Sequence, residues 1–567
     1  MARSHGQDTT IETLLQAAGL IAFAVAFVAF CDSMVVRLPR LIYFEPSFTL
    51  ALLREAPLAL AAALVTLALA AWLALPAHRG RLGWASVDRV GGLRWVVFAV
   101  AMALAWNYAA HPYNYFFDRA HALDRWLLVA LAAGTLRSPL LVAPFALELA
   151  VARVQWSHPI NAMTLITDQL PLRVLAVALG AAAWNDLHGL AARLASDSRR
   201  RLGAWIDRSG PLRTSSVVFA TLCLVGFYYT TAGLGKLVLG EGPLDWVRES
   251  HLENLHVASH LNGWLAGVSE ARILANASIL GGIAPWLAAG TLAIELGTVL
   301  ILARPRGTIA ILAAVVSMHL GILLASGIFF WKWMVLEVAL CAWLWRRRDA
   351  REIQRVYSGR LFAGSILLIG ALVAAIAHNQ FAWWNTRWTM LYRTEVVDAA
   401  GRVYLFDYAD LPTVEIFDLY KPEREPGWNT TAYGMTKNQA LMRMLQEGDP
   451  EALKTFAAAS AGLADSELNQ RKRGAFLGFM STYFRNRNRA PDRTVPPFWL
   501  SAPAKNVRHA VGPEVYRDQA PIVAVRLRFQ EIYYDGEGLH RARDAIVYST
   551  PVIPLQEPAG EDAAAPP

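Results

Sequence analysis

TSSVVFATLCLVGFYYTTAGLGKL, residues 214 to 237, decides the fold, because it carries only one charged residue, Lys236. A helix that rises 1.5 Å per residue needs about 20 apolar residues to cross the ~30 Å hydrocarbon core of a bilayer. This stretch is long enough and apolar enough, so it predicts a membrane span.

Similar apolar runs recur over the first two thirds of the chain. Of its 567 residues, 55% are hydrophobic and only 17% are charged, whereas soluble domains carry about 25% charged residues. This balance excludes an ordinary soluble enzyme. We expect membrane spans near residues 12 to 36, 55 to 76, 92 to 109, 171 to 189, 214 to 237, 281 to 303, 307 to 327, 329 to 346 and 360 to 379.

The stretch from 125 to 154 is ambiguous. It is long enough for one tilted span, but Arg137 and Ser138-Pro139 interrupt its middle, where an unpaired Arg costs about 2.5 to 3.5 kcal/mol. Short loops rich in Lys and Arg favour the cytoplasmic side. The Arg-containing loops 77 to 94 and 190 to 213 share that side only if the stretch crosses an even number of times. We therefore expect two short helices here and two crossings.

The same charge bias orients the whole chain in the cell membrane. The Arg-rich loop 346 to 360 is also expected to be cytoplasmic, which gives a cytoplasmic N-terminus and an odd total of about nine to eleven transmembrane helices. Everything after about residue 380 then lies outside the cytoplasm. The net charge of +8 is thus read as a topology signal, so no nucleic-acid partner is expected.

Beyond residue 380 the pattern changes to that of a soluble domain. Residues 388 to 392 and 403 to 406 flank a Gly-containing turn and predict a β-hairpin, and a second β-like run at 522 to 529 precedes Asp535-Gly536. The fold class is therefore an all-α polytopic membrane bundle with a C-terminal extracytoplasmic mixed α+β soluble domain. The expected divisions are 1–380 for the membrane domain, 381–555 for the α+β domain and 556–567 for a disordered tail.

Lys236, at the end of its apolar run, has two interpretations. A lysine at this position is commonly an anchor that extends its ammonium group to the membrane surface. Alternatively, partial burial lowers the pKa of a lysine and leaves a neutral amine that can take a proton. Gly235-Lys236 is no phosphate loop, because Leu237 follows instead of Ser or Thr.

The residues around Lys236 resemble a known family. Ala232-Gly233-Leu234-Gly235-Lys236-Leu237, followed by Asp245-Trp246-Val247, is similar to the core of the vitamin K-dependent gamma-carboxylases, members of the wider group that shares the HTTM domain. Trp156-Ser157-His158, a helix with Glu295 and a helix with His319 agree with this resemblance. It covers roughly residues 10 to 345, and extra residues between Lys236 and Trp246 depart from the family pattern.

The resemblance implies an activity and a set of site residues. In those enzymes the lysine that matches Lys236 acts as a base on reduced vitamin K, whose oxygenation leads to proton removal from a glutamate before CO2 is added. His158 matches an active-site histidine. The implied cofactors are a vitamin K hydroquinone of the menaquinol type together with CO2 and O2, with no metal. The implied partners are membrane lipid and a glutamate-containing exported peptide.

The expected topology provides a check on these assignments. Lys236 ends an inside-to-outside helix and His158 lies in an outer loop, so both catalytic candidates fall at the outer surface. We expect the cofactor-binding residues to lie beside and below them, in a polar funnel that a quinone ring enters from the lipid. These residues are His319, Glu295, Tyr229 and Trp246.

Each of these residues also has a structural interpretation. Glu295 and His319 can pair with each other or with Arg137 as a structural clamp, and Asp168 and Glu337 have weaker spacing support. A separate group could bind zinc but lacks a well-spaced third ligand, and an interfacial helix is preferred there; it comprises His251, Glu253, His256 and His260. The rival function is a non-catalytic membrane module that binds or helps mature an exported partner through the C-terminal domain.

Overall fold

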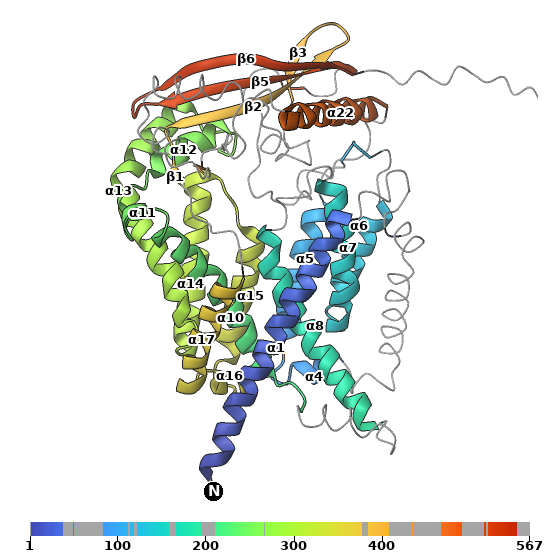
Figure 1. Ribbon diagram of the computed structural model, residues 1–567, viewed down its shortest axis with the longest axis vertical. Coiled ribbons are helices and arrows are strands. Elements are labelled where there is room, and N and C mark those ends of the chain that lie inside the picture. Colours follow the sequence, from blue (N-terminus) through green and yellow to red (C-terminus); the bar gives the residue numbers. More distant parts are fainter. Residues whose placement is uncertain are drawn as a thin grey trace, which may run out of the picture.

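The chain forms a helical bundle capped by a small β-sheet in a computed structural model (Figure 1). The sheet and the long helix beneath it lie at one end of the bundle, and α4 and α16 lie at the other. The structure describes residues 2–37, 49, 83–110, 114–117, 122–157, 166–193, 210–265, 267–376, 384–406, 433–434, 467–489, 515–516 and 520–552.

The described part of the chain is mostly helical. Its helices are α1 (Ala2–Arg37), α4 (Trp84–Val87), α5 (Leu93–Ala109), α6 (Ala122–Gly134), η3 (Pro139–Leu141), α7 (Val142–Ser157), α8 (Ile166–Arg193), α10 (Thr214–Leu237), α11 (Asp245–Arg248), α12 (Leu252–Leu261), α13 (Glu270–Gly297), η5 (Thr298–Leu300), α14 (Pro305–Ser326), α15 (Trp331–Arg347), α16 (Arg351–Val356), α17 (Gly359–Ala375) and α22 (Glu467–Arg489).

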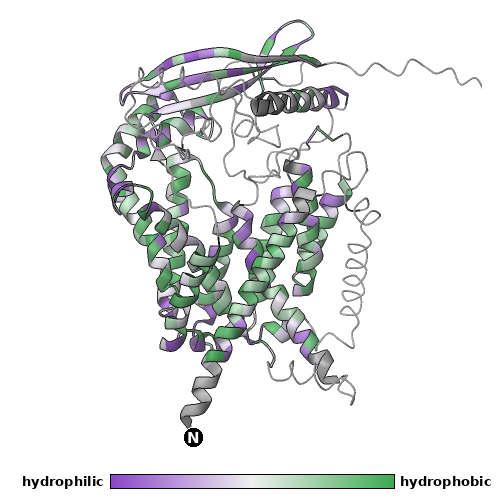
Figure 2. Ribbon diagram, viewed as in Figure 1, coloured by the Kyte–Doolittle hydropathy of each residue, from purple (hydrophilic) through white to green (hydrophobic). Residues whose placement is uncertain are grey.

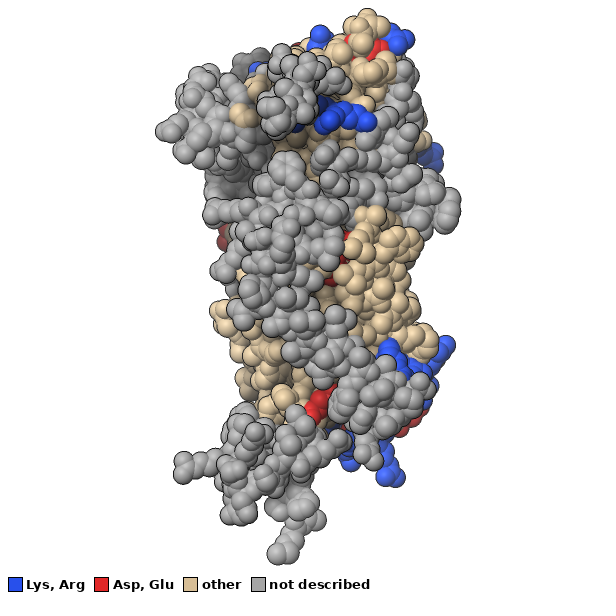
Figure 3. All heavy atoms as spheres, turned by 90° about the vertical axis from the view of Figure 1, so that its right-hand side faces the viewer, with Lys and Arg blue, Asp and Glu red and all other residues tan. Residues whose placement is uncertain are grey.

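Five segments of the described helices are long and apolar enough to cross a membrane. They are Thr10–Ser33, Thr167–His188, Thr214–Leu237, Glu270–Leu300 and Pro305–Ser326. Hydrophobic residues dominate the bundle, whereas hydrophilic ones appear along the sheet and at the helix ends (Figure 2). On the face drawn in Figure 3, lysine and arginine gather towards the two ends. These features suggest a membrane-embedded protein; its orientation and its total number of crossings stay predictions.

Helix α10 occupies the centre of the bundle, and nearly all of its residues are buried. Two glycines let other helices approach it closely. A Cβ added at Gly226 would lie 2.8 Å from the side chain of Ile369 on α17, and one at Gly233 would lie 2.9 Å from Leu296 on α13. The predicted helix over 214 to 237 is confirmed to the residue.

The ambiguous stretch 125 to 154 forms two helices, α6 and α7, as expected. Ser138 caps the short η3 between them by accepting a hydrogen bond from the backbone of Leu140, with Pro139 at the first helical position. Arg137 thus lies at the break between the helices, where it does not interrupt a continuous span.

The helix expected at 281 to 303 was placed too late. α13 begins at Glu270, eleven residues earlier than residue 281, because Ser269 accepts a hydrogen bond from the Arg272 backbone and caps the helix there. The stretch between the expected spans 214 to 237 and 281 to 303 therefore contains α11, α12 and the first turns of α13. The span expected at 55 to 76 lies outside the described residues.

The C-terminal region is a four-stranded antiparallel sheet in the order β3-β2-β5-β6. The predicted hairpin around Gly401 is confirmed, and the β-like run at 522 to 529 lies in β5, which pairs with β6 across the turn at Asp535-Gly536. The described strands are β1 (Trp384–Asn385), β2 (Trp388–Asp398), β3 (Val403–Leu405), β4 (Tyr433–Gly434), β5 (Ile522–Tyr534) and β6 (Leu539–Pro551).

Helix α22 joins the sheet to the bundle. Phe484 of α22 packs edge-on against Phe406, with ring centroids 4.9 Å apart. Asn486 on the same helix donates hydrogen bonds to the backbone oxygens of Tyr115 (2.9 Å) and Phe116 (3.2 Å), which follow α5. The C-terminal domain is therefore docked on one end of the bundle. Its extracytoplasmic placement stays a prediction, and the tail 556–567 lies outside the described residues.

Candidate functional site

Lys236, in the last turn of α10, forms a buried ion pair with Glu295 of α13. Its Nζ lies 2.8 Å from each carboxylate oxygen of Glu295, and each residue is only 5% exposed. Gly233, one turn earlier on α10, makes this possible, because a Cβ there would lie 3.2 Å from that of Glu295. The close approach of two helices thus brings the two charges together.

Trp246 lies against Lys236 of this pair. The Lys236 ammonium lies 5.2 Å from the centre of the Trp246 ring, within the range of a cation–π interaction. Trp246 is held on the short helix α11, whose first residue, Asp245, accepts a hydrogen bond of 2.5 Å from the backbone of Gly242. The sequence-predicted residues Lys236, Glu295 and Trp246 are therefore in contact.

Tyr229 lies two helical turns before Lys236 on the same face of α10, and it contacts a second buried group. Its hydroxyl donates a hydrogen bond to Glu337 of α15 and lies 3.4 Å from Nε2 of His319 on α14. Nδ1 of His319 lies 3.2 Å from the other oxygen of Glu337. The Phe330 ring stacks on His319, with centroids 5.1 Å apart.

These two groups are neighbours in one polar region. Lys236 and Tyr229 lie two turns apart on one face of α10, so the two groups lie along the same side of that helix. We call the five side chains the Lys236 cluster, and its members come from four helices, α10, α13, α14 and α15. They are Lys236, Glu295, Tyr229, His319 and Glu337.

The structural clamp considered for Glu295 and His319 has different partners from those expected. Glu295 pairs with Lys236, and His319 contacts Glu337. Among the described residues, neither is joined to Arg137, which lies at the break between α6 and η3. The clamp hypothesis named the wrong partners for Glu295 and His319, because pairing across helices depends on packing that sequence spacing does not reveal.

The environment of Lys236 differs from that of a membrane anchor. A snorkelling lysine keeps its ammonium group in water or among headgroups. Here the group is buried and bound to a carboxylate. Ionisable side chains inside long apolar helices commonly mark functional sites.

The second catalytic candidate, His158, lies outside the described residues, as does the side chain of Trp156. Helix α7 ends at Ser157, directly before His158. The predicted proximity of His158 to Lys236 therefore stays a prediction.

A second buried lysine was missed by sequence reasoning. Lys332 of α15 donates a hydrogen bond to Asp168 of α8, which also accepts one from the hydroxyl of Tyr108. The available signal was a lysine between two tryptophans at the start of an apolar run, since a charge in such a run is rarely exposed to lipid. We call these three residues the Lys332 group.

Two of the histidines considered for zinc, His251 before α12 and His256 within it, have structural partners. Nδ1 of His256 lies 2.7 Å from the backbone oxygen of Ala325, and His251 contacts Glu253 at 2.8 Å. Burial lowers the pKa of His256 and of His260. Over the residues that the structure describes, no group of three or more His, Cys, Asp or Glu side chains is placed to hold a metal ion.

The Lys236 cluster combines groups that can exchange protons. A carboxylate adjoins an ammonium group, and a phenol bridges a carboxylate and an imidazole. Such arrangements suit general acid–base chemistry when a substrate reaches them. No family model matches this chain, and no curated protein or solved structure matches it either.

Proposed function

We propose that this chain is a membrane enzyme of the gamma-carboxylase-like class, in which Lys236 acts as a base on a reduced lipid quinone and a glutamate in a peptide is modified. The observation that carries the proposal is the buried, bidentate pairing of Lys236 with Glu295 inside apolar helices. Ionisable side chains in such helices are costly and commonly mark proton pathways.

Glu295 gives Lys236 a way to become a base. An ammonium group cannot accept a proton until it has lost one, and the nearest acceptor is the Glu295 carboxylate at 2.8 Å. Moving one proton along this hydrogen bond converts the ion pair into a neutral amine and a carboxylic acid. A low-dielectric interior reduces the disadvantage of the neutral pair, because it penalises charges strongly. The neutral amine can then take a proton from a hydroxyl group.

The remaining members of the cluster form a second proton-sharing group two turns away along α10. Tyr229 donates to Glu337 and adjoins His319, so a proton can move through the phenol and the imidazole. His319 has two neighbours, the Tyr229 hydroxyl and the Glu337 carboxylate. These neighbours determine which ring nitrogen of His319 carries a hydrogen.

The surroundings of Lys236 fit a reduced quinone. Leu234, Val238 and Leu244 are exposed large hydrophobic residues beside Lys236 and Trp246, so an apolar ring and tail have a surface on which to lie. Trp246 would cover the ring, and the Lys236–Glu295 pair would supply a donor and an acceptor for its hydroxyl. A bound quinol supplies the reducing equivalents that are spent with O2. The side chains of the chain position it and accept its proton.

The test measures incorporation of labelled CO2 into a glutamate-containing peptide by membranes supplied with reduced menaquinone and O2. Lys236→Arg keeps the charge but cannot act as a base near neutral pH, so we expect a loss of roughly 100-fold or more. The matched control is Lys332→Arg in the Lys332 group, another buried lysine paired with a carboxylate. We expect it to remain active. Full incorporation by Lys236→Arg would contradict the proposal.

The rival proposal is a non-catalytic membrane module. It is favoured by β6, a long strand at the edge of the described four-stranded sheet, on which Ile546 is exposed. An exposed edge strand can pair with a strand of a partner. The exchange Lys236→Glu with Glu295→Lys separates the two proposals, because it keeps the ion pair but moves the amine to α13. A module keeps its function in this variant, whereas the enzyme loses it.

A further inference from the structure

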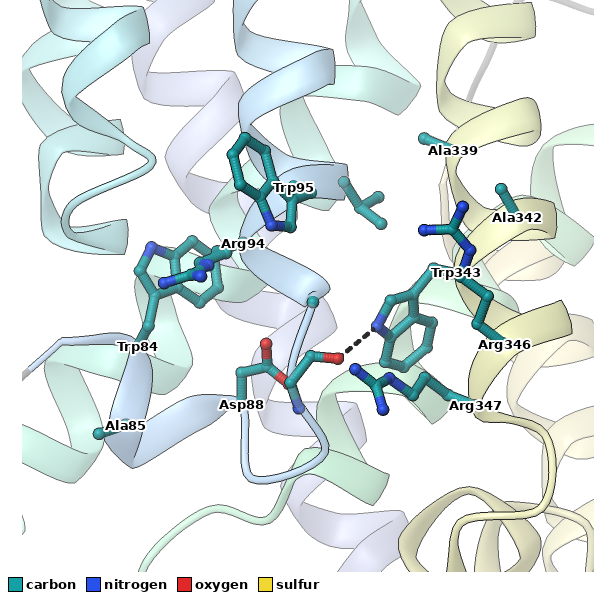
Figure 4. A pocket seen from close by; sticks show the side chains of 13 residues that line it. Trp84, Ala85, Asp88, Arg94, Trp95, Ala339, Ala342, Trp343, Arg346 and Arg347 are labelled. Carbon is teal, nitrogen blue, oxygen red and sulfur yellow. Dashed lines mark hydrogen bonds between the residues drawn. The ribbon is translucent and has the colours of Figure 1, made fainter.

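A cavity of about 700 Å³ opens at the end of the bundle opposite the sheet. It lies between the loop that precedes α5, the first turn of α5 and the last turns of α15 (Figure 4). Its principal lining residues are Trp84, Arg94, Trp95, Trp343, Arg346 and Arg347. Cavities of this size are typical of binding sites for small molecules.

The cavity has an excess of positive charge. Three guanidinium groups line it, and the one acidic residue in its lining is Asp88. The Asp88 carboxylate already accepts hydrogen bonds from the backbone of Gly91 at 2.8 Å and of Leu93 at 2.7 Å, although Arg347 also acts on it electrostatically. Within the described ranges, no salt bridge joins Arg94, Arg346 or Arg347 to an acidic side chain.

The aromatic walls are fixed by the protein itself. Trp343 donates a hydrogen bond of 3.1 Å to the backbone oxygen of Gly91, as Figure 4 shows. Gly91 and Gly92 have φ angles of 82° and 98°, which favour glycine. A Cβ added at Gly92 would lie 3.1 Å from the Trp343 ring. Trp84 donates to the backbone of Thr135 at 2.9 Å. The cavity is therefore preformed.

The rim of the cavity has the composition of a membrane interface. Trp95, which lines the cavity from α5, is exposed, and tryptophan is enriched at the level of lipid headgroups. Val96, Ala339 and Ala342 add an apolar wall beside the arginines. A ligand that fits this lining has an anionic head and an apolar tail.

Arginines whose only role is to set the membrane topology would not need to line one common cavity. Here Arg94 comes from α5, whereas Arg346 and Arg347 come from α15, far along the sequence, and all three line one space. Guanidinium groups bind phosphate oxygens through paired hydrogen bonds. Basic pockets between membrane helices are suited to phosphorylated lipid heads.

We propose that this cavity binds the phosphate-bearing headgroup of an anionic phospholipid, with Arg94, Arg346 and Arg347 holding the phosphate and the tryptophan and alanine side chains contacting the acyl chains. The site is separate from the Lys236 cluster, so this proposal does not depend on the proposed enzyme activity.

The test uses the purified full chain in detergent and follows its melting temperature and lipid binding by native mass spectrometry. Phosphatidylglycerol is expected to bind and to raise the melting temperature, whereas phosphatidylcholine and inorganic phosphate are not. Changing Arg94, Arg346 and Arg347 together to Gln should weaken phosphatidylglycerol binding by roughly 100-fold, since each basic residue near an anionic lipid contributes about fivefold.

The matched control changes three other arginines at the same end of the bundle, none of which lines the cavity. The control residues are Arg348, Arg351 and Arg355. Equal loss of binding in the control would overturn the proposal in favour of general surface attraction. Stabilisation by inorganic phosphate equal to that by phosphatidylglycerol would overturn the lipid assignment in favour of a free anion.

A variant that keeps every charge completes the test. Ala339→Trp places a large side chain in the apolar part of the cavity and should abolish binding of phosphatidylglycerol without changing the net charge. Unchanged binding in a folded Ala339→Trp protein would contradict the proposal even if the triple arginine variant does not fold.

Discussion

Ion pairs in the helical bundle and in the C-terminal sheet have almost the same geometry but different surroundings. Lys236 and Glu295 meet at 2.8 Å with both side chains 7% exposed. On the sheet, Arg528 lies 2.7 Å from Glu395 and 2.6 Å from Asp544, yet its own side chain is 42% exposed. Water competes for the sheet charges and not for those of the bundle. Distance alone therefore does not indicate what an ion pair contributes.

The difference separates two uses of charge in one chain. Exposed pairs contribute a median of about 0 to 1 kcal/mol, so the sheet can gain or lose them at little cost. Buried pairs are costly to desolvate, and removal of one partner is strongly destabilising. The bundle nevertheless keeps the Lys236 cluster and the Lys332 group within its apolar helices. Under the proposed function, the Lys236 cluster is kept for chemistry, whereas the Lys332 group only joins helices α8 and α15.

The largest expected effect comes from breaking the buried pair on one side only. Glu295→Ala leaves the Lys236 ammonium buried without its carboxylate, so we expect a loss of about 3 to 5 kcal/mol in the free energy of unfolding. Replacing both residues with Met should recover most of this loss. Denaturant unfolding of the purified chain in detergent measures both values.

The control for this prediction is Glu352→Ala, which breaks an exposed pair with Arg355 at the surface of the bundle. It should cost about 0 to 1 kcal/mol. If Glu295→Ala were as mild as this control, the Lys236–Glu295 pair would not be desolvated as described.

Glycine substitutions provide the next comparison between the two regions. Gly327, after α14, has φ 67°, and a Cβ there would lie 2.4 Å from the backbone oxygen of Trp264. Gly401, in the β2–β3 turn, has φ 79° and no heavy atom within 4 Å of such a Cβ. Gly401→Ala should cost about 1 to 2 kcal/mol from backbone strain alone, and Gly327→Ala about 2 to 4 kcal/mol because overpacking adds to the strain.

Thermal unfolding of the two alanine variants in the same detergent checks this order. Equal losses would mean that the backbone around Gly327 shifts to accommodate the new methyl group.

The elements that sequence reasoning predicted are those determined by local pattern. An uninterrupted apolar run sets the bounds of α10, and a Gly-containing turn between apolar stretches sets the β2–β3 hairpin. Ser138-Pro139 likewise marks the break between α6 and α7. These signals act over a few residues, so no tertiary information is needed to recognise them.

Partners of buried charges were not predictable in the same way. Glu295 pairs with Lys236 across 59 positions, and Lys332 with Asp168 across 164. Which pairs form depends on how helices pack, and that depends on small residues such as Gly233, which allows α13 to approach α10. The early start of α13 was missed because the Ser269 cap lies in a stretch of moderate polarity that resembles a loop.

A smaller effect is expected from the exposed ion pairs of the sheet. Arg528→Ala removes contacts to Glu395 and Asp544, but 42% of the arginine side chain is exposed to solvent. We expect a loss of about 0.2 to 1 kcal/mol that shrinks as salt is added. Unfolding measured at two salt concentrations tests this, and a loss as large as that of Glu295→Ala would remove the contrast between sheet and bundle.

The smallest effect is expected at Asp535, in the turn between β5 and β6. Hydrogen bonds from the backbone N–H groups of Glu537 and Gly538, at 2.8 Å each, hold the pKa of Asp535 well below its ordinary value of 3.8, and His540 adds to this. A group whose pKa is lowered on folding stabilises the folded state above its unfolded pKa, and this contribution is lost as the pH falls through its folded pKa.

Asp535→Asn keeps an acceptor oxygen but removes the charge. The difference in unfolding free energy between the parent chain and this variant should therefore be constant near neutral pH and diminish below about pH 4. Glu537→Gln, at an exposed neighbouring position, serves as the control. A difference between Asp535→Asn and the parent that persists unchanged at low pH would show that the turn does not depend on the Asp535 charge.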